Sequence, residues 1–388
     1  MKTISVIIFF LYFLNVEAQN SPDIYYFNKN VVARVIAYNA ESGQLTELYK
    51  TARENQSADT VSIKIKRKET VQKCFRVPQD FIKAHPASPF CIDALKMLGD
   101  GKTTSPVQLT GLEKLFDLLD EEVKNSDEGK QYAQQLLKWE WLKKIKEAAE
   151  DPATMACISN AGVKMGLSEI AAKPVVVKKA TTPNKRLDAE VLAAKIKAST
   201  LILNMGYRSK DGAFKANSAT AYVIDESGIC VTNYHVLEEY ISKEIYSSLF
   251  TLNAEGKSYP VTKILSCSEA DDLAIFQVDI MQDKFIPLTI GEWAAEGTEI
   301  SVLSHPNQTF YQLTTGKITN YSESTWRNKP CLEMNITAEF SVGSSGGPVV
   351  DSYGNLVGTV SRYYQNSEGI LTRTCIPVSL LKQLLIFN

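Results

Sequence analysis

The sequence lacks the closely spaced ligand pairs from which structural zinc sites are usually built. Its seven cysteines form no C-x-x-C pair, and its three histidines (His85, His235 and His305) lie far from them along the chain. We therefore expect no metal site. The odd number of cysteines leaves at least one thiol without a cysteine partner, and the pairing of the others stays open.

An excess of charge of either sign is also missing. The chain carries 42 basic and 44 acidic side chains, for a net charge of −2 and an isoelectric point of about 6.1. Proteins that bind nucleic acid usually present a basic excess, so we expect no nucleic-acid partner. With 388 residues, 44% of them hydrophobic and 22% charged, the composition is that of a globular protein of two or three domains.

Long apolar runs are absent except at the N-terminus. Lys2 precedes the apolar stretch 4–16 (ISVIIFFLYFLNV), and Val16-Glu17-Ala18 resembles a small-x-small cleavage site. This pattern predicts a signal peptide over residues 1–18 and a secreted or periplasmic protein, with an uncleaved anchor as the alternative. No later stretch approaches the roughly 18 apolar residues of a spanning helix, so we expect no membrane span once the signal is removed.

A segment with two prolines and several lysines divides the rest of the chain. Residues 172–187 (AKPVVVKKATTPNKRL) show little core pattern and predict a linker. Residues 188–388 contain many short β-like runs separated by turn residues, which predicts a mainly β sandwich or barrel. The runs are 219–224, 228–233, 272–278, 299–304, 347–350 and 356–361. The last segment, 379–387, predicts an amphipathic helix on the outside.

The first part, residues 19–171, has a mixed pattern. Alternating runs at 31–38 (VVARVIAY) and 60–68 (TVSIKIKRK) predict strands. Residues 111–125 and 129–150 carry apolar side chains at helical spacing and predict an antiparallel helix pair. We therefore expect an N-terminal α+β domain of unknown function, with no chemistry of its own that the sequence reveals.

The second part contains a glycine-rich segment suited to a nucleophile. Glycines surround Ser345 in Gly343-Ser344-Ser345-Gly346-Gly347-Pro348. They permit a tight turn that exposes the hydroxyl and directs successive N–H groups into one concavity. We predict Ser345 as the nucleophile and the N–H groups of Gly343 and Ser345 as donors to an oxyanion. A glycine-rich hairpin turn is the alternative.

Two further segments offer a base and an orienting acid. His235 follows the apolar run Val231-Thr232-Asn233-Tyr234, and Asp272 directly precedes another apolar run. Imidazole exchanges protons near neutral pH, and a buried carboxylate fixes its tautomer. Each residue alone could equally be structural, but the chain order His, Asp, Ser is that of the two-barrel peptidases. A His235–Asp272–Ser345 triad follows.

The same segments resemble the trypsin-like serine peptidases of the bacterial HtrA-like type. AYVIDESGICVTNYHVL is similar to their first-barrel hairpin, DLAIFQV to their Asp-Leu-Ala motif, and ITAEFSVGSSGGPVVDSYGNLVGTV to their serine loop. CIPVSLLKQLL resembles their closing strand and helix. The resemblance covers nearly all of 195–388 and implies a double β-barrel and peptide hydrolysis through an acyl-enzyme, without a cofactor.

The resemblance has departures. Ser218-Ala219-Thr220 replaces the family's usual Gly-Ser-Gly, and the chain stops at residue 388, where relatives often continue into PDZ modules. PDZ-regulated, oligomeric quality control is therefore not carried over. Glu339, six residues before Ser345, falls near the floor of the S1 pocket in trypsin-like enzymes, which implies a preference for Lys or Arg at P1. A surface glutamate is the alternative.

The sequence thus predicts a secreted serine endopeptidase whose partners are protein or peptide substrates. A catalytically silent or latent binding module on the same fold is the competing hypothesis. For residues 19–171 three roles stay open: an inhibitory pro-segment, a substrate-recruiting module and a partner-binding domain.

Overall fold

We analysed the protein as a computed structural model. It describes residues 22–99, 106–151, 173–180, 185–210, 212, 214–242, 248–365 and 371–388. The predicted signal peptide, residues 1–18, lies outside the described residues, as does Cys157. The chain divides into two compact units, Met1–Glu140 and Trp141–Asn388. This division falls before the segment that the sequence predicts as a linker.

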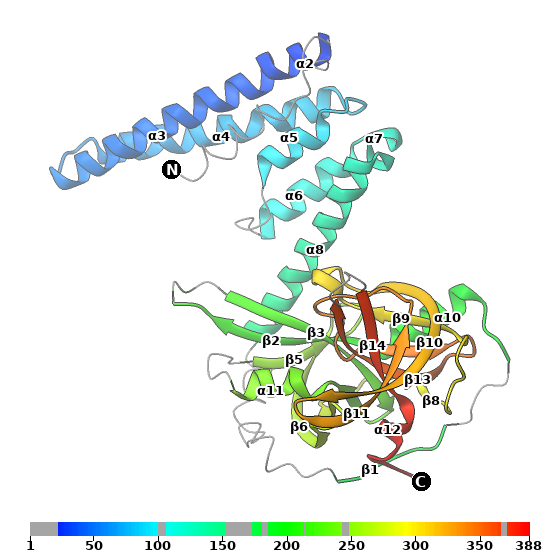
Figure 1. The fold of residues 1–388 in the computed structure, drawn as a ribbon. Helices are drawn as coiled ribbons and strands as arrows, with labels where there is room; N and C mark the ends of the chain where they lie inside the picture. The colour runs from blue at the N-terminus through cyan, green and yellow to red at the C-terminus, as the bar shows by residue number, and fades with distance from the viewer. Residues whose placement is uncertain are drawn as a thin grey trace. The chain divides into compact units, whose positions relative to one another are not determined.

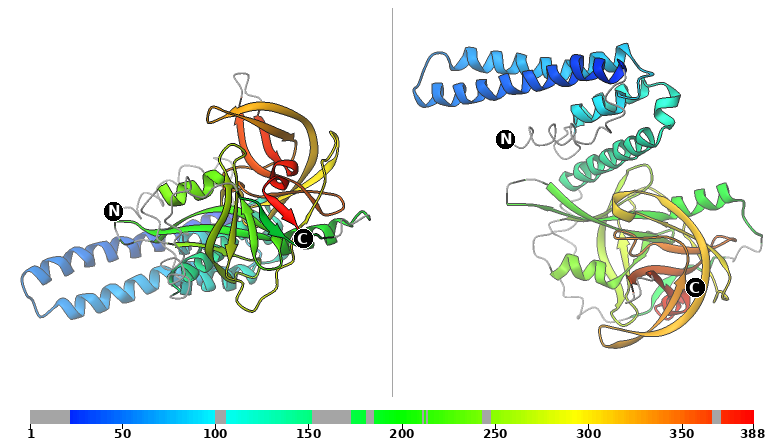
Figure 2. Two further views of the ribbon diagram at one scale, coloured as in Figure 1. Left: turned by 90° about the horizontal axis from the view of Figure 1, so that it is seen from below. Right: turned by 45° about the horizontal axis from the view of Figure 1, so that its top comes forward.

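The described part of the first unit is helical. Its elements are α2 (Pro22–Phe27), η2 (Asn28–Val32), α3 (Ala33–Glu54), α4 (Thr60–Ala84), α5 (Cys91–Leu98), α6 (Pro106–Asp117), α7 (Glu121–Asn125) and the start of α8 (Asp127–Glu150). Helical backbone at Phe27 and Val32 makes α2, η2 and α3 one continuous run. The long helices α3 and α4 lie side by side (Figures 1 and 2). Their core includes Val31, Phe81, Ile82 and Leu95.

The two strands predicted in this unit are wrong. In 31–38 the buried residues are Val31, Val32 and Val35, a helical spacing, while Ile36 is exposed. In 60–68 the alternation has no buried face, because Val61 and Ile65 are both more than half exposed. β-propensity mainly reflects packing on a half-buried sheet, and without that packing the run stays helical within α4. The helix predicted over 129–150 is confirmed within α8, whereas the one predicted over 111–125 is divided at residues 118–120 into the end of α6 and α7.

The second unit contains two β-barrels. The first is a closed barrel in the order β2-β3-β4-β7-β6-β5. Its strands are β2 (Thr200–Arg208), β3 (Phe214–Asp225), β4 (Ile229–Thr232), β5 (Ser248–Leu252), β6 (Ser258–Ser268) and β7 (Leu273–Val278). Helix α10 (Ala189–Ser199) leads into β2, and α11 (Tyr234–Ser242) follows β4.

The second barrel has the strand order β12-β9-β10-β11-β14-β13-β8, and an additional β12–β13 pairing closes the ring. Its strands are β8 (Thr289–Ile290), β9 (Glu299–Ser304), β10 (Gln312–Trp326), β11 (Lys329–Ile336), β12 (Pro348–Asp351), β13 (Asn355–Gln365) and β14 (Leu371–Pro377). Short turns join several neighbouring strands, and η4 (Pro306–Gln308) separates β9 from β10. Each of the six strand runs predicted in 188–388 is confirmed.

A buried apolar layer joins the two barrels. Tyr222 and Ile275 of the first barrel pack with Leu303, Val350 and Ile376 of the second. Each barrel also has an interior core of its own. Side chains that stand at the ends of the strands near this layer can therefore meet across the barrel boundary.

The segment predicted as a linker is partly built into the second unit. Val175–Val177 form strand β1, which pairs in parallel with β15 (Leu385–Phe387), and Val177 is buried. The predicted C-terminal helix is correspondingly short: α12 (Val378–Lys382) ends before β15. The helix cannot extend over 379–387 because residues 385–387 are taken up by pairing with β1. Leu381, which the prediction placed on an outer helix, is buried.

Candidate active site

Register places His235 and Asp272 at the same edge of the first barrel. Strands β4 and β7 are antiparallel neighbours, and Thr232, the last residue of β4, lies opposite Ala274 near the start of β7. His235, the second residue of α11, therefore lies just beyond the end of β4, beside the residue that precedes β7. The segment is fixed further because the amide of Asn233 and the backbone N–H of Tyr234 donate to the carbonyl oxygen of Asp272, at 3.0 and 3.2 Å.

The carboxylate of Asp272 holds the imidazole of His235. The distances from Nδ1 to Oδ1 and Oδ2 are 2.9 and 3.0 Å, and the backbone N–H of His235 also donates to Oδ1, at 3.1 Å. The Asp272 side chain is 3% exposed and that of His235 is 29% exposed. A carboxylate accepts, so Nδ1 carries the proton and Nε2 is left as an acceptor. This is the tautomer that a general base requires.

Ser361, on β13 of the second barrel, completes the hydrogen bonding of the buried carboxylate. Its hydroxyl donates to Oδ2 of Asp272 at 2.7 Å. Ser361 is not among the site residues that the sequence predicts. Its only signal is a small hydroxyl at the end of a run of buried β-strand residues, which strands often contain for other reasons.

The serine loop runs between β11 and β12 and touches the first barrel. The backbone N–H of Thr220 donates to the carbonyl of Ser345 at 2.9 Å, and its hydroxyl donates to the carbonyl of Gly343 at 3.0 Å. Thr220 belongs to the triplet that departs from the family's Gly-Ser-Gly. Its hydroxyl therefore contributes a contact that holds the loop, which a glycine would not supply.

Glycine is required at two positions of this loop. Gly343 and Gly346 have φ of +95° and +83°, which disfavour residues with a Cβ. A Cβ at Gly346 would also lie 2.2 Å from the carbonyl oxygen of Thr220, and one at Gly343 would lie 2.5 Å from that of His305. No described residue accepts a hydrogen bond from the backbone N–H of Gly343 or Ser345. These two donors are thus available to an oxyanion.

The hydroxyl of Ser345 donates to the carbonyl of Ser361 at 3.3 Å. Among the described residues it makes no hydrogen bond to His235. The structure therefore brings His235 and Asp272 into direct contact. Ser361 links Asp272 to Ser345, because its hydroxyl donates to the first and its backbone carbonyl accepts from the second.

Glu339, the predicted specificity residue, lies on the surface. Its side chain is 82% exposed, and one carboxylate oxygen is 4.0 Å from Nη2 of Arg373. Its backbone carbonyl accepts a hydrogen bond from Thr314 at 2.8 Å. A pocket-floor carboxylate would be largely buried, so this position matches the surface alternative. A role for Glu339 in P1 preference stays a hypothesis.

His305 is buried within the second unit. Its Nδ1 accepts a hydrogen bond from the backbone N–H of Tyr311 at 2.9 Å, and the ring stacks edge-on against that of Tyr311. Burial lowers the pKa of His305 to about 3, because the charged imidazolium would be poorly solvated there. The residue is thus held neutral and structural at ordinary pH.

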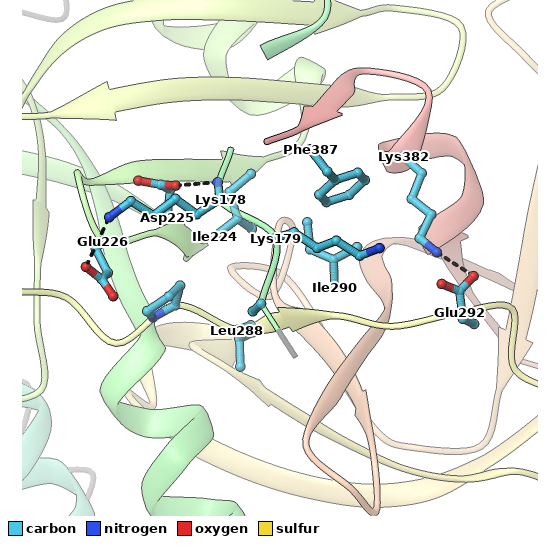
Figure 3. A pocket seen from close by; sticks show the side chains of 12 residues that line it. Lys178, Lys179, Ile224, Asp225, Glu226, Leu288, Ile290, Glu292, Lys382 and Phe387 are labelled. Carbon is cyan, nitrogen blue, oxygen red and sulfur yellow. Dashed lines mark hydrogen bonds and ion pairs between the residues drawn. The ribbon is translucent and has the colours of Figure 1, made fainter. Parts of the chain in front are cut away.

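A separate hollow of about 350 Å³ lies beside β1 and β15 (Figure 3). Ile224, Leu288, Ile290 and Phe387 line it with apolar surface. Ion pairs stand at its sides: Lys178 with Glu226 at 3.6 Å, and Lys382 with Glu292 at 2.5 Å. None of the predicted site residues lines it, so it is distinct from the His235–Asp272 site.

The described residues hold no cluster of three or more His, Cys, Asp or Glu side chains placed to bind a metal. None of the helices in the described ranges is long and apolar enough to span a bilayer.

Comparison with known proteins agrees with this architecture. The model of the family "Trypsin-like peptidase domain" matches residues 219–358, which include all three predicted triad residues. The chain is 28% identical over 156 residues to Protease Do-like 1, chloroplastic, of Arabidopsis thaliana, covering 39% of this chain and 34% of that protein. It is 23% identical over 150 residues to Serine protease HTRA2, mitochondrial, of Drosophila grimshawi, covering 38% and 34%.

The chain thus spans about a third of the length of these curated relatives. The family match at residues 219–358 lies wholly within the two-barrel unit. The second unit of this protein therefore contains a trypsin-like peptidase domain, weakly homologous to the HtrA and Do-like serine proteases.

Proposed function

We propose that this protein is a serine endopeptidase in which Ser345 is the nucleophile, His235 the general base and Asp272 the residue that orients the base. The observation that carries the proposal is the pair of hydrogen bonds between Nδ1 of His235 and the buried Asp272 carboxylate. His235 and Asp272 share a trypsin-like domain with the glycine-rich serine loop.

The proposed cycle follows from this geometry. The Ser345 hydroxyl turns from the carbonyl of Ser361 to Nε2 of His235, loses its proton to the imidazole and attacks the peptide carbonyl. The oxyanion accepts hydrogen bonds from the N–H groups of Gly343 and Ser345. The imidazolium, stabilised by Asp272, then protonates the leaving amine, and water releases the acyl group by the same route. The cycle requires no cofactor.

One observation favours a second candidate, a latent or silent protein-binding module on the same fold. The Ser345 hydroxyl is engaged by Ser361 rather than by His235. If this arrangement persists with substrate, the serine would not be deprotonated and the domain would bind without cleaving.

Labelling with a fluorophosphonate separates the two candidates. The probe reacts with a serine only when its base is in place, so we expect wild-type protein to be labelled on Ser345 and the His235→Ala variant not to be. Peptide mapping identifies the labelled residue. Absence of label from a folded wild-type protein would support the silent module.

We further propose that residues 1–18 direct export and that the first unit recruits a partner or restrains the peptidase. The apolar run after Lys2 supports the first part, and the compactness of the helical unit supports the second. N-terminal sequencing of protein recovered outside the cytoplasm tests the cleavage after Ala18.

A further inference from the structure

The hairpin formed by β10 and β11 ends in a sharp turn close to the candidate active site. Trp326 pairs with Lys329 across the turn, and the two residues between them, Arg327 and Asn328, have φ of +49° and +62°. Two successive residues with positive φ are typical of a type I′ hairpin turn, which holds the flanking strands in a fixed twist. We call Trp326–Lys329 the hairpin tip.

Two cations of the hairpin tip reach from the second barrel to the first. Arg327 donates from Nη1 and Nη2 to the two carboxylate oxygens of Glu238, at 2.8 and 2.5 Å. Lys329 donates to Glu269 at 2.6 Å, and Arg327 is also 3.7 Å from that carboxylate. A two-point guanidinium–carboxylate contact fixes orientation as well as distance.

Both carboxylates belong to the segments that carry the proposed base and acid. Glu238 follows His235 by three residues on α11. Glu269 precedes Asp272 by three residues, and its carbonyl accepts the backbone N–H of Asp272 at 3.4 Å. The hydrogen bond from Lys329 lowers the pKa of Glu269, so this carboxylate is charged at neutral pH.

The hairpin tip is anchored on its other side to the strand that carries Ser361. The guanidinium of Arg362 lies over the ring of Trp326, 4.3 Å from its centre, and forms an ion pair with Glu333. Arg362 directly follows Ser361, whose hydroxyl donates to Asp272. Asp272 is therefore bonded to β13, and β13 contacts the hairpin tip through Arg362. The hairpin tip in turn is paired with Glu238 in the His235 segment and with Glu269 in the Asp272 segment.

We propose that Arg327 and Lys329 are positioning residues, which hold the His235 and Asp272 segments of the first barrel against the second barrel that carries Ser345. This inference rests on the proposed function. A base must lie within hydrogen-bond reach of its nucleophile, and a displacement of about 1 Å can cost roughly 100-fold in rate. Exposed ion pairs contribute little to stability. If Arg327 and Lys329 were merely structural, their loss would therefore leave the reactivity of Ser345 nearly unchanged, whereas a positioning role predicts that it falls.

The test uses the full-length protein and the rate of labelling of Ser345 by a fluorophosphonate, which needs no knowledge of the natural substrate. For the Arg327→Ala/Lys329→Ala double variant we expect the maximal labelling rate to fall about 10- to 100-fold with the half-saturating probe concentration unchanged. The single variant Arg327→Lys should label at a rate between those of wild type and the double variant, because an ammonium lacks the guanidinium fork. Arg186→Ala, which removes an exposed 2.5 Å pair with Glu299, is the matched control and should label like wild type.

A second readout is independent of activity. The Nδ1 proton of His235, hydrogen-bonded to Asp272, should give a far-downfield proton NMR signal in wild type and in Ser345→Ala, and lose intensity in the double variant. Labelling and signal unchanged in a folded double variant would overturn the positioning role while leaving the peptidase proposal intact. A wild type that is not labelled, but whose signal still depends on the hairpin tip, would contradict the peptidase and support the positioning.

Discussion

At the scale of single residues, the buried Asp272 carboxylate organises the site. It accepts from the ring and backbone of His235 and from the hydroxyl of Ser361. Sequence patterns could indicate Asp272, because it directly precedes an apolar strand in the expected chain order. They could not indicate Ser361, because its role depends on β13 of the second barrel reaching an acid on the first.

Ser361→Ala should reduce activity as well as stability. Loss of a hydrogen bond to a charged group costs about 1.5–3 kcal/mol of stability. Because the freed carboxylate holds the imidazole less firmly, we also expect kcat/KM to fall roughly 10- to 100-fold. Thr359→Val is the matched control, since it removes a buried hydroxyl contact, with Tyr222 at 2.7 Å, from the same strand but not from the triad. Equal losses of activity in both variants would indicate a general effect of β13.

His305 should make the fold sensitive to acid. Burial lowers its pKa from 6.5 to about 3. Between these two pH values the imidazole is therefore protonated in the unfolded chain but neutral in the folded chain. Its stabilising contribution is full above pH 6.5 and declines as the pH falls toward 3. Urea unfolding of the Ser345→Ala protein between pH 7 and 5 should show this decline. His305→Asn, in that background, should be less stable but show a shallower pH slope; an unchanged slope would refute the assignment.

At the scale of elements, backbone shape at the serine loop is as important as side-chain chemistry. The glycines of 343–347 were recognisable because the loop needs positive φ and close approach to β3. The strands predicted at 31–38 and 60–68 are wrong because local alternation, unlike the glycine pattern, forms a strand only where a neighbouring sheet is present. Alternation within eight or nine residues cannot reveal whether a sheet exists to receive it, and here long helices surround both runs.

Gly346→Ala should disable the serine loop, whereas Gly297→Ala should not. Both glycines have φ of +83°, so both substitutions carry the strain of a left-handed residue, about 1–3 kcal/mol. Only at Gly346 would the new Cβ meet backbone, at 2.2 Å, while Gly297 has open space around it. We expect loss of fluorophosphonate labelling in Gly346→Ala alone. Matching melting temperatures and labelling in the two variants would contradict this account of the loop.

At the scale of the whole molecule, the second compact unit begins at Trp141, before the segment that the sequence predicts as a linker. Trp141, Ile145 and Ala149, from the end of α8, pack with Ile202 and Phe250 of the first barrel. An amphipathic pattern predicts a helix, but it does not predict which of two units the apolar side chains at each end of that helix pack against. The β1–β15 pairing could not be predicted either, because each partner is only three residues long.

A fragment of residues 141–388 should therefore be markedly more stable than one of residues 188–388. The shorter fragment loses the packing of Trp141 and Ile145 and the partner of β15. Loss of one buried tryptophan costs about 3–5 kcal/mol, which corresponds to roughly 10 °C in Tm for a unit of this size. Thermal unfolding of both fragments with Ser345→Ala, to prevent self-cleavage, measures the difference. Equal Tm values would show that α8 is dispensable to the barrels.

The central claim is that Ser345 is the nucleophile of a peptidase, and casein hydrolysis by the wild-type chain beside Ser345→Ala tests it most directly. Loss of a triad nucleophile should lower turnover by roughly a million-fold, so a crude assay suffices. The account predicts cleavage by wild type and none by the variant. Equal cleavage by both proteins, or none by a wild-type fragment of residues 141–388 that is fully folded, would contradict it.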